Sequence, residues 1–484
     1  MMNTDFTGFF YPRSLTFLGA SNDPGKWGFR VLSNILGGKF EGKIYPVNPK
    51  GGEILGLQVY PSVGDLPEVP DLAVIVVPPK AMLEAIRECG QKVIKSCVVI
   101  TAGFAEVSEE GAAVQRQMVE EAHKAGMRFI GPNCFGLLST PVKLYSQMPR
   151  VYPPRGPIAV VSQSGNVGLT IARRAMALDI GVSRVISTGN EADLHAEDFI
   201  EFLADDDETK VILSYIEGFK NGKRFFEAVS KATRKKPVVM IKVGATEAGA
   251  AAARSHTAAL SGSDEIFDGM CRQAGVIRVN GLDELMNVGY GFLTNPLPKG
   301  KRVGIVTLGG GWGVLAADAC AKQGLEVVKL SPEIIAEMDT FLPAWWSRNN
   351  PVDLVAGAMG ESMLRVMEIF ARWEKIDGII ALGVPAPSTI WGPMPKTEEE
   401  MKERMKFVAT AFFESYQKVK NISLQSGKQI VLAAELPLPQ GQRAIEFEII
   451  KGIGRLNMVN YALPHEAALV MRNLVRYREY LNGH

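Results

Sequence analysis

The 484-residue sequence has little cysteine and little histidine, with five residues of each. The cysteines lack the CxxC spacing typical of a metal site, and an odd number cannot pair completely. We therefore expect each to be a small buried apolar residue, and we expect no metal site. The N-terminal stretch, MMNTDFTGFFYPRS, lacks the basic start and long apolar run of a secretory signal. It predicts a reducing, cytoplasmic setting.

The sequence also lacks an excess of either charge and a long apolar run. Its 53 Lys and Arg residues nearly balance 52 Asp and Glu, which excludes the basic composition typical of nucleic-acid binding. The longest apolar runs, 72–77 and 376–384, fall far short of the roughly 20 residues that cross a membrane, so we expect no membrane span. With 46% hydrophobic residues, the composition is that of a soluble globular protein.

Short β-branched runs alternate with helix-like stretches, a pattern typical of an α/β fold with doubly wound parallel sheets. Three such domains are predicted, over residues 1–139, 150–294 and 300–484. The Pro-rich segment 140–157 is predicted to be a linker, because its prolines suit neither a helix nor an inner strand. Strands are expected at 15–18, 44–47, 72–77, 97–100, 127–130, 158–161, 184–187, 211–216, 238–241, 276–279 and 303–306.

A turn rich in small residues, GASNDPGKWG from Gly19 to Gly28, follows the first predicted strand and opens a helix. Backbone N–H groups and the helix dipole at such a turn can face a phosphate, and Ser21, Lys26 and Lys50 are close in sequence. The turn is not GxGxxG, and no acidic residue follows the second strand to bind a ribose, which disfavours NAD. A phosphate-bearing ligand is favoured, while an ordinary tight turn and solvated lysines are the alternative.

A second turn of this kind consists of Ser162, Gln163, Ser164 and Gly165, after the predicted strand 158–161. Its N–H groups and hydroxyls can hold an anion at the start of the next helix. Plain serine capping of that helix is the alternative.

Two residues are candidates for chemistry. His256 lies in a stretch of small residues, 249–262, where phosphate can approach an imidazole closely. Glu217 ends the predicted strand 211–216, at the edge where open α/β sheets bind their ligands. Its carboxylate can bond one imidazole nitrogen and leave the other as a nucleophile. A structural histidine and a solvated glutamate are the alternatives, and capping of a helix explains His195.

Taken in order, several of these stretches resemble the α-subunit of ADP-forming acyl-CoA synthetases of the acetyl-CoA type, in the succinyl-CoA synthetase superfamily. The stretches are GASNDPGKWG, VVSQSGNVG, STGNEADLHAEDFIEFLADD, SYIEG and ARSHTAALSG, and the resemblance covers residues 14–285. The third domain, with GGGWG and NPVD, is similar to an additional ligase domain of these enzymes. The resemblance implies a Rossmann-like CoA-binding domain followed by two flavodoxin-like ligase domains.

The resemblance also implies roles for the candidate residues. His256 becomes transiently phosphorylated, Glu217 orients it, and the turn from Ser162 to Gly165 cradles the phosphoryl group. The implied contacts to the phosphates of coenzyme A are Gly19, Ser21, Lys26, Gly28 and Lys50.

The implied reaction interconverts acyl-CoA, ADP and phosphate with a small carboxylic acid, CoA and ATP through an acyl phosphate. The sequence has no convincing Walker loop and no spare segment long enough for an ATP-grasp module. A separate ATP-grasp β-subunit, which binds ADP or ATP with Mg²⁺ in an α2β2 assembly, is therefore implied. A non-catalytic CoA-binding regulatory subunit and an NAD-dependent dehydrogenase are the competing hypotheses.

Overall fold

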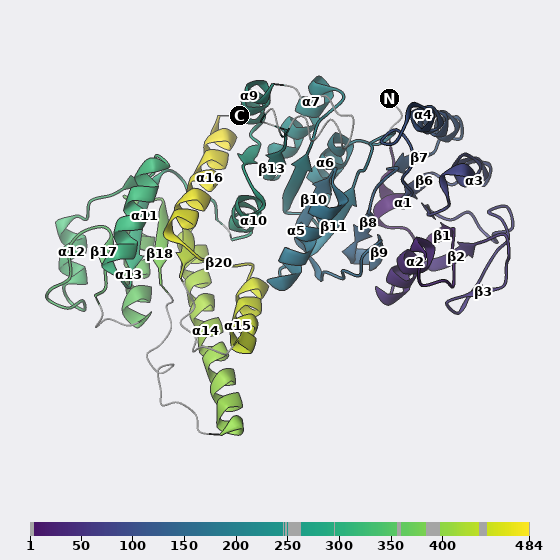
Figure 1. Ribbon diagram of the computed structural model, residues 1–484. Coiled ribbons are helices and arrows are strands. Elements are labelled where there is room, and N and C mark those ends of the chain that lie inside the picture. The colour runs from purple at the N-terminus through teal and green to yellow at the C-terminus, as the bar shows by residue number, and fades with distance from the viewer. Residues whose placement is uncertain are drawn as a thin grey trace. The chain divides into compact units, whose positions relative to one another are not determined.

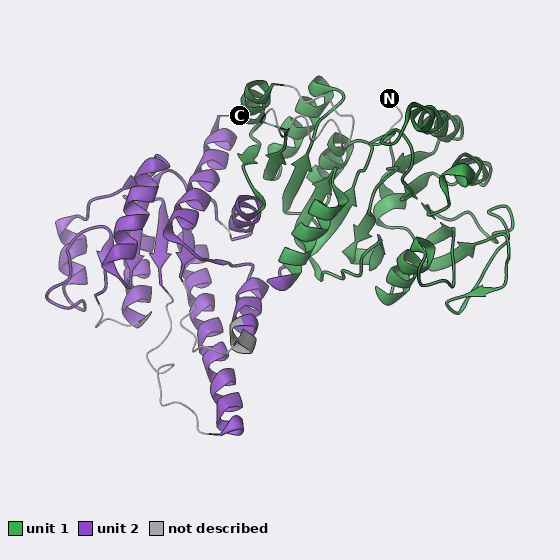
Figure 2. Cartoon of the chain, in the orientation of Figure 1, with its two compact units in different colours: residues 1–176, 181–282 green, residues 177–180, 283–484 purple. Residues whose placement is uncertain are grey.

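The structure is a computed structural model in which the chain forms three main sheets flanked by helices (Figure 1). It describes residues 4–244, 246, 249, 263–294, 296–355, 360–383, 397–434 and 443–483. The chain divides into two compact units (Figure 2). Unit 1 consists of residues 1–176 and 181–282, and unit 2 of residues 177–180 and 283–484.

Unit 1 begins with a parallel sheet in the order β2-β1-β5-β6-β7. Its strands are β1 (Ser14–Leu18), β2 (Lys43–Val47), β5 (Leu72–Ile75), β6 (Ser96–Val99) and β7 (Arg128–Ile130). The helices of this part are α1 (Thr7–Phe10), α2 (Trp27–Gly37), α3 (Pro79–Gln91) and α4 (Glu109–Lys124), and β3 (Glu53–Ile54) and β4 (Leu57–Gln58) form a separate hairpin. The strands expected from the sequence are all present, with bounds that differ by one or two residues.

The second sheet of unit 1 has the order β14-β13-β12-β10-β11-β8-β9 and is parallel except for β8 and β9. Its strands are β8 (Gly136–Ser139), β9 (Leu144–Gln147), β10 (Arg155–Ser162), β11 (Val182–Ser187), β12 (Val211–Ile216), β13 (Val238–Lys242) and β14 (Ile277–Val279). Its helices are α5 (Gly165–Ala177), α6 (Ala196–Asp205), α7 (Gly222–Thr233) and α9 (Asp264–Ala274).

The prediction that 140–157 is a plain linker is wrong. The segment contains β9, which forms an antiparallel pair with β8 and extends the second sheet at its edge. Its prolines all lie outside β9, and Pro141 falls in a 3₁₀ turn over Thr140–Val142. An edge strand with prolines beside it, rather than within it, keeps its ladder hydrogen bonds, so the proline count did not exclude a strand.

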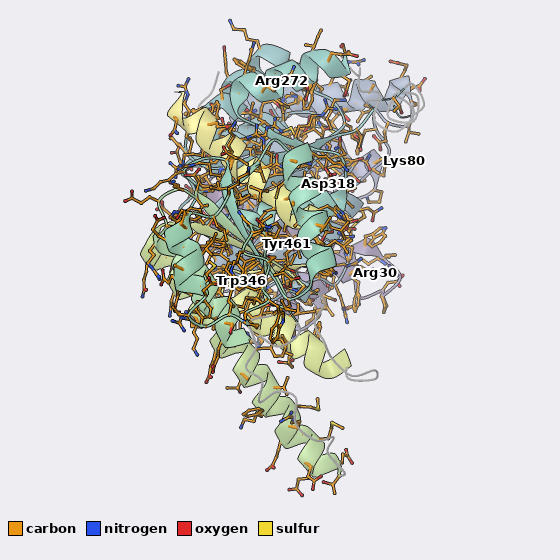
Figure 3. All side chains as sticks on the ribbon, turned by 90° about the vertical axis from the view of Figure 1, so that its left-hand side faces the viewer. Arg30, Lys80, Arg272, Asp318, Trp346 and Tyr461 are labelled. Atoms are coloured by element: carbon orange, nitrogen blue, oxygen red, sulfur yellow. The ribbon has the colours of Figure 1, made fainter. Side chains whose placement is uncertain are left out.

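Unit 2 contains a parallel sheet in the order β16-β15-β18-β19-β20, with β17 also paired to β15. Its strands are β15 (Arg302–Thr307), β16 (Glu326–Val327), β17 (Val352–Asp353), β18 (Gly378–Leu382), β19 (Gln429–Ala433) and β20 (Asn460–Tyr461). The helices are α10 (Leu282–Gly291), α11 (Gly310–Lys322), α12 (Pro332–Met338), α13 (Gly360–Arg372), α14 (Glu398–Ser426), α15 (Arg443–Arg455) and α16 (Pro464–Asn482). Figure 3 labels Trp346 and Tyr461, two large side chains buried in this unit. None of the described helices is long and apolar enough to cross a membrane.

All three sheets share one strand order, which confirms the prediction of a doubly wound α/β fold. When the main parallel strands of each sheet are counted along the chain, leaving out β17, the order is 2-1-3-4-5. In this order the connections on the two sides of the first strand run in opposite directions, and ligands bind at the carboxyl ends of the strands there. The turns after β1 and β10 both occupy this position in their sheets.

The two sheets of unit 1 share a hydrophobic core. The ring of Phe10, from α1, stacks on that of Phe202, from α6, with 4.6 Å between centroids. Next to them the fully buried guanidinium of Arg184 lies 3.4 Å from Asp206 and 4.6 Å from the Tyr11 ring centroid. The first two predicted domains therefore form one packed unit, and their exact boundaries stay predictions.

Candidate functional site

Unit 1 contains a cavity of about 1000 Å³. It lies at the carboxyl ends of β1, β5 and β6, and residues that follow β10 and β11 line it as well. Four of the five residues predicted to contact coenzyme A line this cavity, and so do three of the four from the second turn. These residues are Gly19, Ser21, Lys26, Gly28, Gln163, Ser164 and Gly165. The cavity therefore brings the two predicted phosphate turns to one space.

The turn between β1 and α2 is built on two close backbone contacts. Gly19 has a φ of +92°, and a Cβ there would lie 2.6 Å from the carbonyl oxygen of Val76. A Cβ on Gly28 would lie 2.0 Å from the carbonyl oxygen of Gly19. Lys26, the N-cap of α2, has an extended backbone and makes no side-chain cap bond. The first turn of α2 is thus left with uncapped N–H groups, which suits an anionic ligand.

Lys50 is exposed and lies outside the residues that line the cavity, although its neighbours Asn48 and Pro49 line it. The Asn48 side chain links the turns after β1 and β2, because its Nδ2 donates to the Ala20 oxygen at 2.8 Å and its Oδ1 accepts the N–H of Lys50 at 3.0 Å. Sequence reasoning did not single out Asn48. The role of Lys50 toward coenzyme A stays a prediction.

The second turn connects β10 to α5. Ser162 is the last residue of β10, is fully buried, and donates its hydroxyl to the Ser164 oxygen at 2.6 Å. That hydroxyl shapes the turn itself. Gly165 begins α5 beside Phe135, and a Cβ at Gly165 would lie 2.5 Å from the Phe135 ring. Among these residues, Gln163, Ser164 and Gly165 line the cavity directly.

The side-chain amide of Gln163 ties this turn to the end of β12. Its Oε1 accepts the backbone N–H groups of Glu217 at 2.5 Å and Gly218 at 3.1 Å. Its Nε2 donates to the Gly218 oxygen at 2.7 Å and to Glu191 Oε2 at 2.8 Å. Each polar atom of this amide thus makes two hydrogen bonds, which leaves it one orientation. Glu217 is thereby held next to the predicted phosphate turn, and it is only 4% exposed.

His256 lies outside the described residues. Its predicted pairing with Glu217 therefore stays a prediction. The described chain reaches Val243 and Gly244 after the end of β13, and β13 is the parallel neighbour of β12.

Glu191 is a buried carboxyl that sequence reasoning missed as a site residue. Its Oε1 accepts the N–H of Ala196 at 2.9 Å, its Oε2 is bound by Gln163, and burial raises its pKa to about 7. The signal that pointed to Glu217 applies here too, because Glu191 follows β11, the neighbour of β10.

His195 caps α6, as the sequence predicted: Asp198 Oδ2 accepts the His195 backbone N–H at 2.9 Å. Burial lowers the pKa of His195, but the hydrogen bond to Asp198 and the charges of Glu191 and Glu197 outweigh burial and raise it. A positive charge on this imidazole is therefore favoured next to Glu191.

The five cysteines are all buried, as predicted, and they form no disulfide with one another. In the part of the chain that the structure describes, no group of three or more His, Cys, Asp or Glu side chains is arranged to hold a metal ion.

Family models match nearly the whole of unit 1 and part of unit 2. A CoA binding domain matches residues 13–140, a succinyl-CoA ligase like flavodoxin domain matches residues 155–292, and a Ligase-CoA domain matches residues 303–391.

Curated relatives decide the family. The chain is 44% identical over 377 residues to acetate–CoA ligase (ADP-forming) II subunit alpha of Pyrococcus furiosus, a match that covers 78% of this chain and 82% of that one. The chain belongs to the family of ADP-forming acyl-CoA ligases. The chain also matches acetate–CoA ligase (ADP-forming) I of Archaeoglobus fulgidus at 40% identity, over 78% of this chain and 54% of that longer protein. It thus spans about half the length of some family members.

Solved structures agree with this family. The acetyl-coenzyme A synthetase 1 of Candidatus Korarchaeum cryptofilum, solved with phosphate and ADP, has a TM-score of 0.86 and 31% identity, and covers 99% of this chain and 98% of its own. A protein of Pyrococcus horikoshii OT3 has a TM-score of 0.82 and 34% identity, with coverage of 99% and 100%.

Proposed function

We propose that this chain is the α-subunit of an ADP-forming acyl-CoA synthetase, which interconverts acyl-CoA, ADP and phosphate with a small carboxylic acid, CoA and ATP. The observation that carries the proposal is the single cavity shared by the turn from Gly19 to Gly28 and the turn from Gln163 to Gly165. A nucleotide-type ligand on the first turn can extend its thioester toward the second. The nucleotide end and the thioester end of one coenzyme A molecule then both lie in this cavity.

The chemistry follows from this arrangement. Phosphate attacks the thioester carbonyl carbon, the C–S bond breaks, and the CoA thiolate takes up the proton that phosphate loses. A nitrogen of His256 then attacks the phosphorus of the acyl phosphate, the P–O bond to the acyl group breaks, and the carboxylate leaves. The N–H groups at the start of α5 stabilise the charge on the transferred oxygens, and Glu217 orients the imidazole.

The phosphoryl group passes from His256 to ADP on a partner. We assign ADP or ATP with Mg²⁺ to a separate ATP-grasp β-subunit, in an α2β2 assembly in the cytoplasm. The Pyrococcus furiosus relative is named as a subunit, and the Archaeoglobus fulgidus relative is a longer single chain, and both facts support a partner.

A regulatory CoA-binding subunit without catalysis is the weaker alternative. The relatives with the strongest matches are named as ligases. A subunit that only binds CoA also has no need for a buried carboxylate such as Glu217 beside the predicted phosphate turn.

The test is phosphoryl labelling of the chain together with its partner and Mg-ATP. The wild-type chain should carry an acid-labile, base-stable label, and the His256→Ala variant should carry none. The His465→Ala variant is the matched control, because His465 lies in the first turn of α16 in unit 2, and it should label like the wild type. Label that persists in His256→Ala would refute the assignment.

The partner requirement is tested in the same preparation. The chain alone should make no net ATP from any acyl-CoA, ADP and phosphate, because positioning of the nucleotide supplies most of the catalysis in phosphoryl transfer. Addition of an ATP-grasp subunit should restore the conversion. Sustained ATP formation by the purified chain alone would overturn the two-subunit proposal.

A further inference from the structure

Glu191 binds the Gln163 amide through its side chain, from the end of a third strand of the second sheet. It follows β11, whereas Gln163 follows β10 and Glu217 follows β12. These three strands are consecutive in the sheet, with β10 in the centre. The chain of bonds from Glu191 through Gln163 to Glu217 therefore crosses the carboxyl edge of the sheet, and Gln163 in its middle lines the cavity.

Both oxygens of the Glu191 carboxylate accept N–H donors. Gln163 Nε2 lies 2.8 Å from Oε2, and the backbone nitrogen of Ala196 lies 2.9 Å from Oε1. A carboxylate, which only accepts, satisfies both donors at once, whereas a primary amide would turn an N–H group toward one of them. The arrangement thus depends on a carboxylate at this position.

The backbone of Glu191 is also held in place. It has a φ of +51°, in the left-handed region that a glutamate seldom adopts, and Lys220 Nζ donates to its carbonyl oxygen at 2.7 Å. A strained backbone conformation of this kind persists only where its surroundings hold it. The Glu191 side chain therefore extends to Gln163 from a backbone that is held in one position.

We propose that Glu191 is a positioning residue for the phosphoryl-transfer site, where it locks the Gln163 amide that holds the backbone of Glu217 and Gly218. The inference rests on the proposed function for its catalytic consequence, and on the described contacts for the positioning itself. Loss of the carboxylate removes one of the four hydrogen bonds of the Gln163 amide, so that Glu217 is held less firmly toward the imidazole that it is proposed to orient.

The charges around Glu191 define its response to pH. His195 and Glu197, from the start of α6, act on its carboxyl directly, and its charge interacts with that of Lys220 in the turn after β12. Asp198 lies 3.8 Å from His195 and also forms an ion pair with Arg224. Because burial raises the pKa of Glu191 to about 7, protonation near neutral pH weakens the bond to Gln163. The rate should therefore fall on the acid side of pH 7 in the wild type.

The decisive variant is Glu191→Gln, with Glu197→Gln as its matched control. Glu197 is a buried carboxyl in the same cluster with a raised pKa caused by burial, and the contacts of Gln163 do not include it. Amide hydrogen exchange at Glu217 and Gly218 should be at least about tenfold faster in Glu191→Gln than in the wild type, because exchange reports local opening. Glu197→Gln should exchange like the wild type. Unchanged exchange in a folded Glu191→Gln variant would overturn the positioning role.

The kinetic readout uses the complex with the partner subunit. Glu191→Gln should lower the rate of phosphohistidine formation about tenfold to a hundredfold, the range for loss of a charge-assisted hydrogen bond, with little change in KM for acyl-CoA. The fall in rate on the acid side of pH 7 that is expected for the wild type should be absent in this variant. In a Gln163→Ala background the same change should have no further effect, because the coupling passes through Gln163.

The outcomes separate the two proposals. If the rate losses of Glu191→Gln and Gln163→Ala added fully in the double variant, Glu191 would not act through Gln163. Absence of any label on wild-type His256 would overturn the proposed function, and the exchange measurement would still decide the positioning role.

Discussion

Gly28 and Gly19 meet so closely that a methyl group on Gly28 would lie 2.0 Å from the Gly19 carbonyl oxygen. This contact fixes the start of α2 against the end of β1, at the wall of the cavity. The two glycines are nine residues apart in the sequence, and the turn between them contains Ser21 and Lys26, which are predicted to contact the phosphates of coenzyme A.

The first prediction follows from this contact. Gly28→Ala should move α2 away from β1 and lower the affinity for CoA at least about tenfold, and overpacking of this kind typically costs about 1–3 kcal/mol of stability. Calorimetric titration with CoA and thermal unfolding measure the two effects. Gly281→Ala is the control, because no atom lies within 4 Å of its added Cβ. Equal CoA binding by Gly28→Ala and wild type would refute the close contact as a determinant of the site.

The second prediction separates the two lysines predicted to contact CoA. Lys26 lines the cavity and Lys50 does not, so Lys26→Ala should weaken CoA binding more than Lys50→Ala. Both losses should shrink at higher salt, since phosphate contacts are partly screened charge interactions. Lys322→Ala, in α11 of unit 2, is the control and should bind like the wild type. If only Lys50→Ala weakened CoA binding, the CoA phosphates would not lie in this cavity beside Lys26.

The third prediction concerns the Glu217 carboxylate. Glu217→Gln retains the shape of the side chain and its backbone bond to Gln163, but removes the charge that stabilises a protonated or phosphorylated imidazole. Turnover should fall by roughly 10² or more. CoA affinity, measured on the same preparation, should stay unchanged because Glu217 is not among the residues that line the cavity. A normal turnover rate would show that Glu217 has only a structural role.

The fourth prediction is a dependence of stability on pH. Burial raises the pKa of Glu191 from 4.5 to about 7, so between these values the folded state binds more protons than the unfolded state. The free energy of unfolding should therefore fall as the pH rises through this window, by up to about 3 kcal/mol from this one group. Denaturant unfolding at pH 5 and pH 8 measures the change.

Glu191→Gln lacks this titrating group. As the pH rises, the unfolding free energy of the wild type should therefore fall relative to that of the variant. Glu106→Gln is the control. Hydrogen bonds from Gly103 and Asn190 outweigh the burial of Glu106 and lower its pKa below 4.5, so its contribution is lost only below that pH, and the difference between wild type and this variant should stay constant from pH 5 to pH 8. A pH-independent difference for Glu191→Gln would contradict the raised pKa.

Much of the fold was predictable because the signals were local. A buried strand in a parallel sheet is a short β-branched run, and β12 has the bounds predicted for it, 211–216. Ser108 caps α4, with its Oγ accepting the N–H of Gly111 at 3.1 Å. Capping and turn chemistry depend on residues a few positions apart, so the sequence can display them. The positions of the two predicted phosphate turns, after β1 and β10, could be predicted for the same reason.

The β9 strand and the shared core of unit 1 were not predictable in this way. β9 is a strand because β8 is beside it, and a local count of prolines does not reveal a pairing partner. The stacking of Phe10 on Phe202 joins residues far apart in the sequence, with no periodicity that links them. Such contacts arise from the packing of whole elements.

By itself, the sequence determined the doubly wound α/β class, the places where turns of small residues follow strands, and the family, because each depends on contiguous residues. Only the tertiary structure decided that Gln163 joins Glu191 to Glu217, that Lys26 rather than Lys50 lines the cavity, and that Asn48 links two turns. The physical reason is that strand order sets which loops meet at the edge of a sheet. Hydrogen bonds between those loops need positions accurate to a few tenths of an ångström, which only the packed sheets supply.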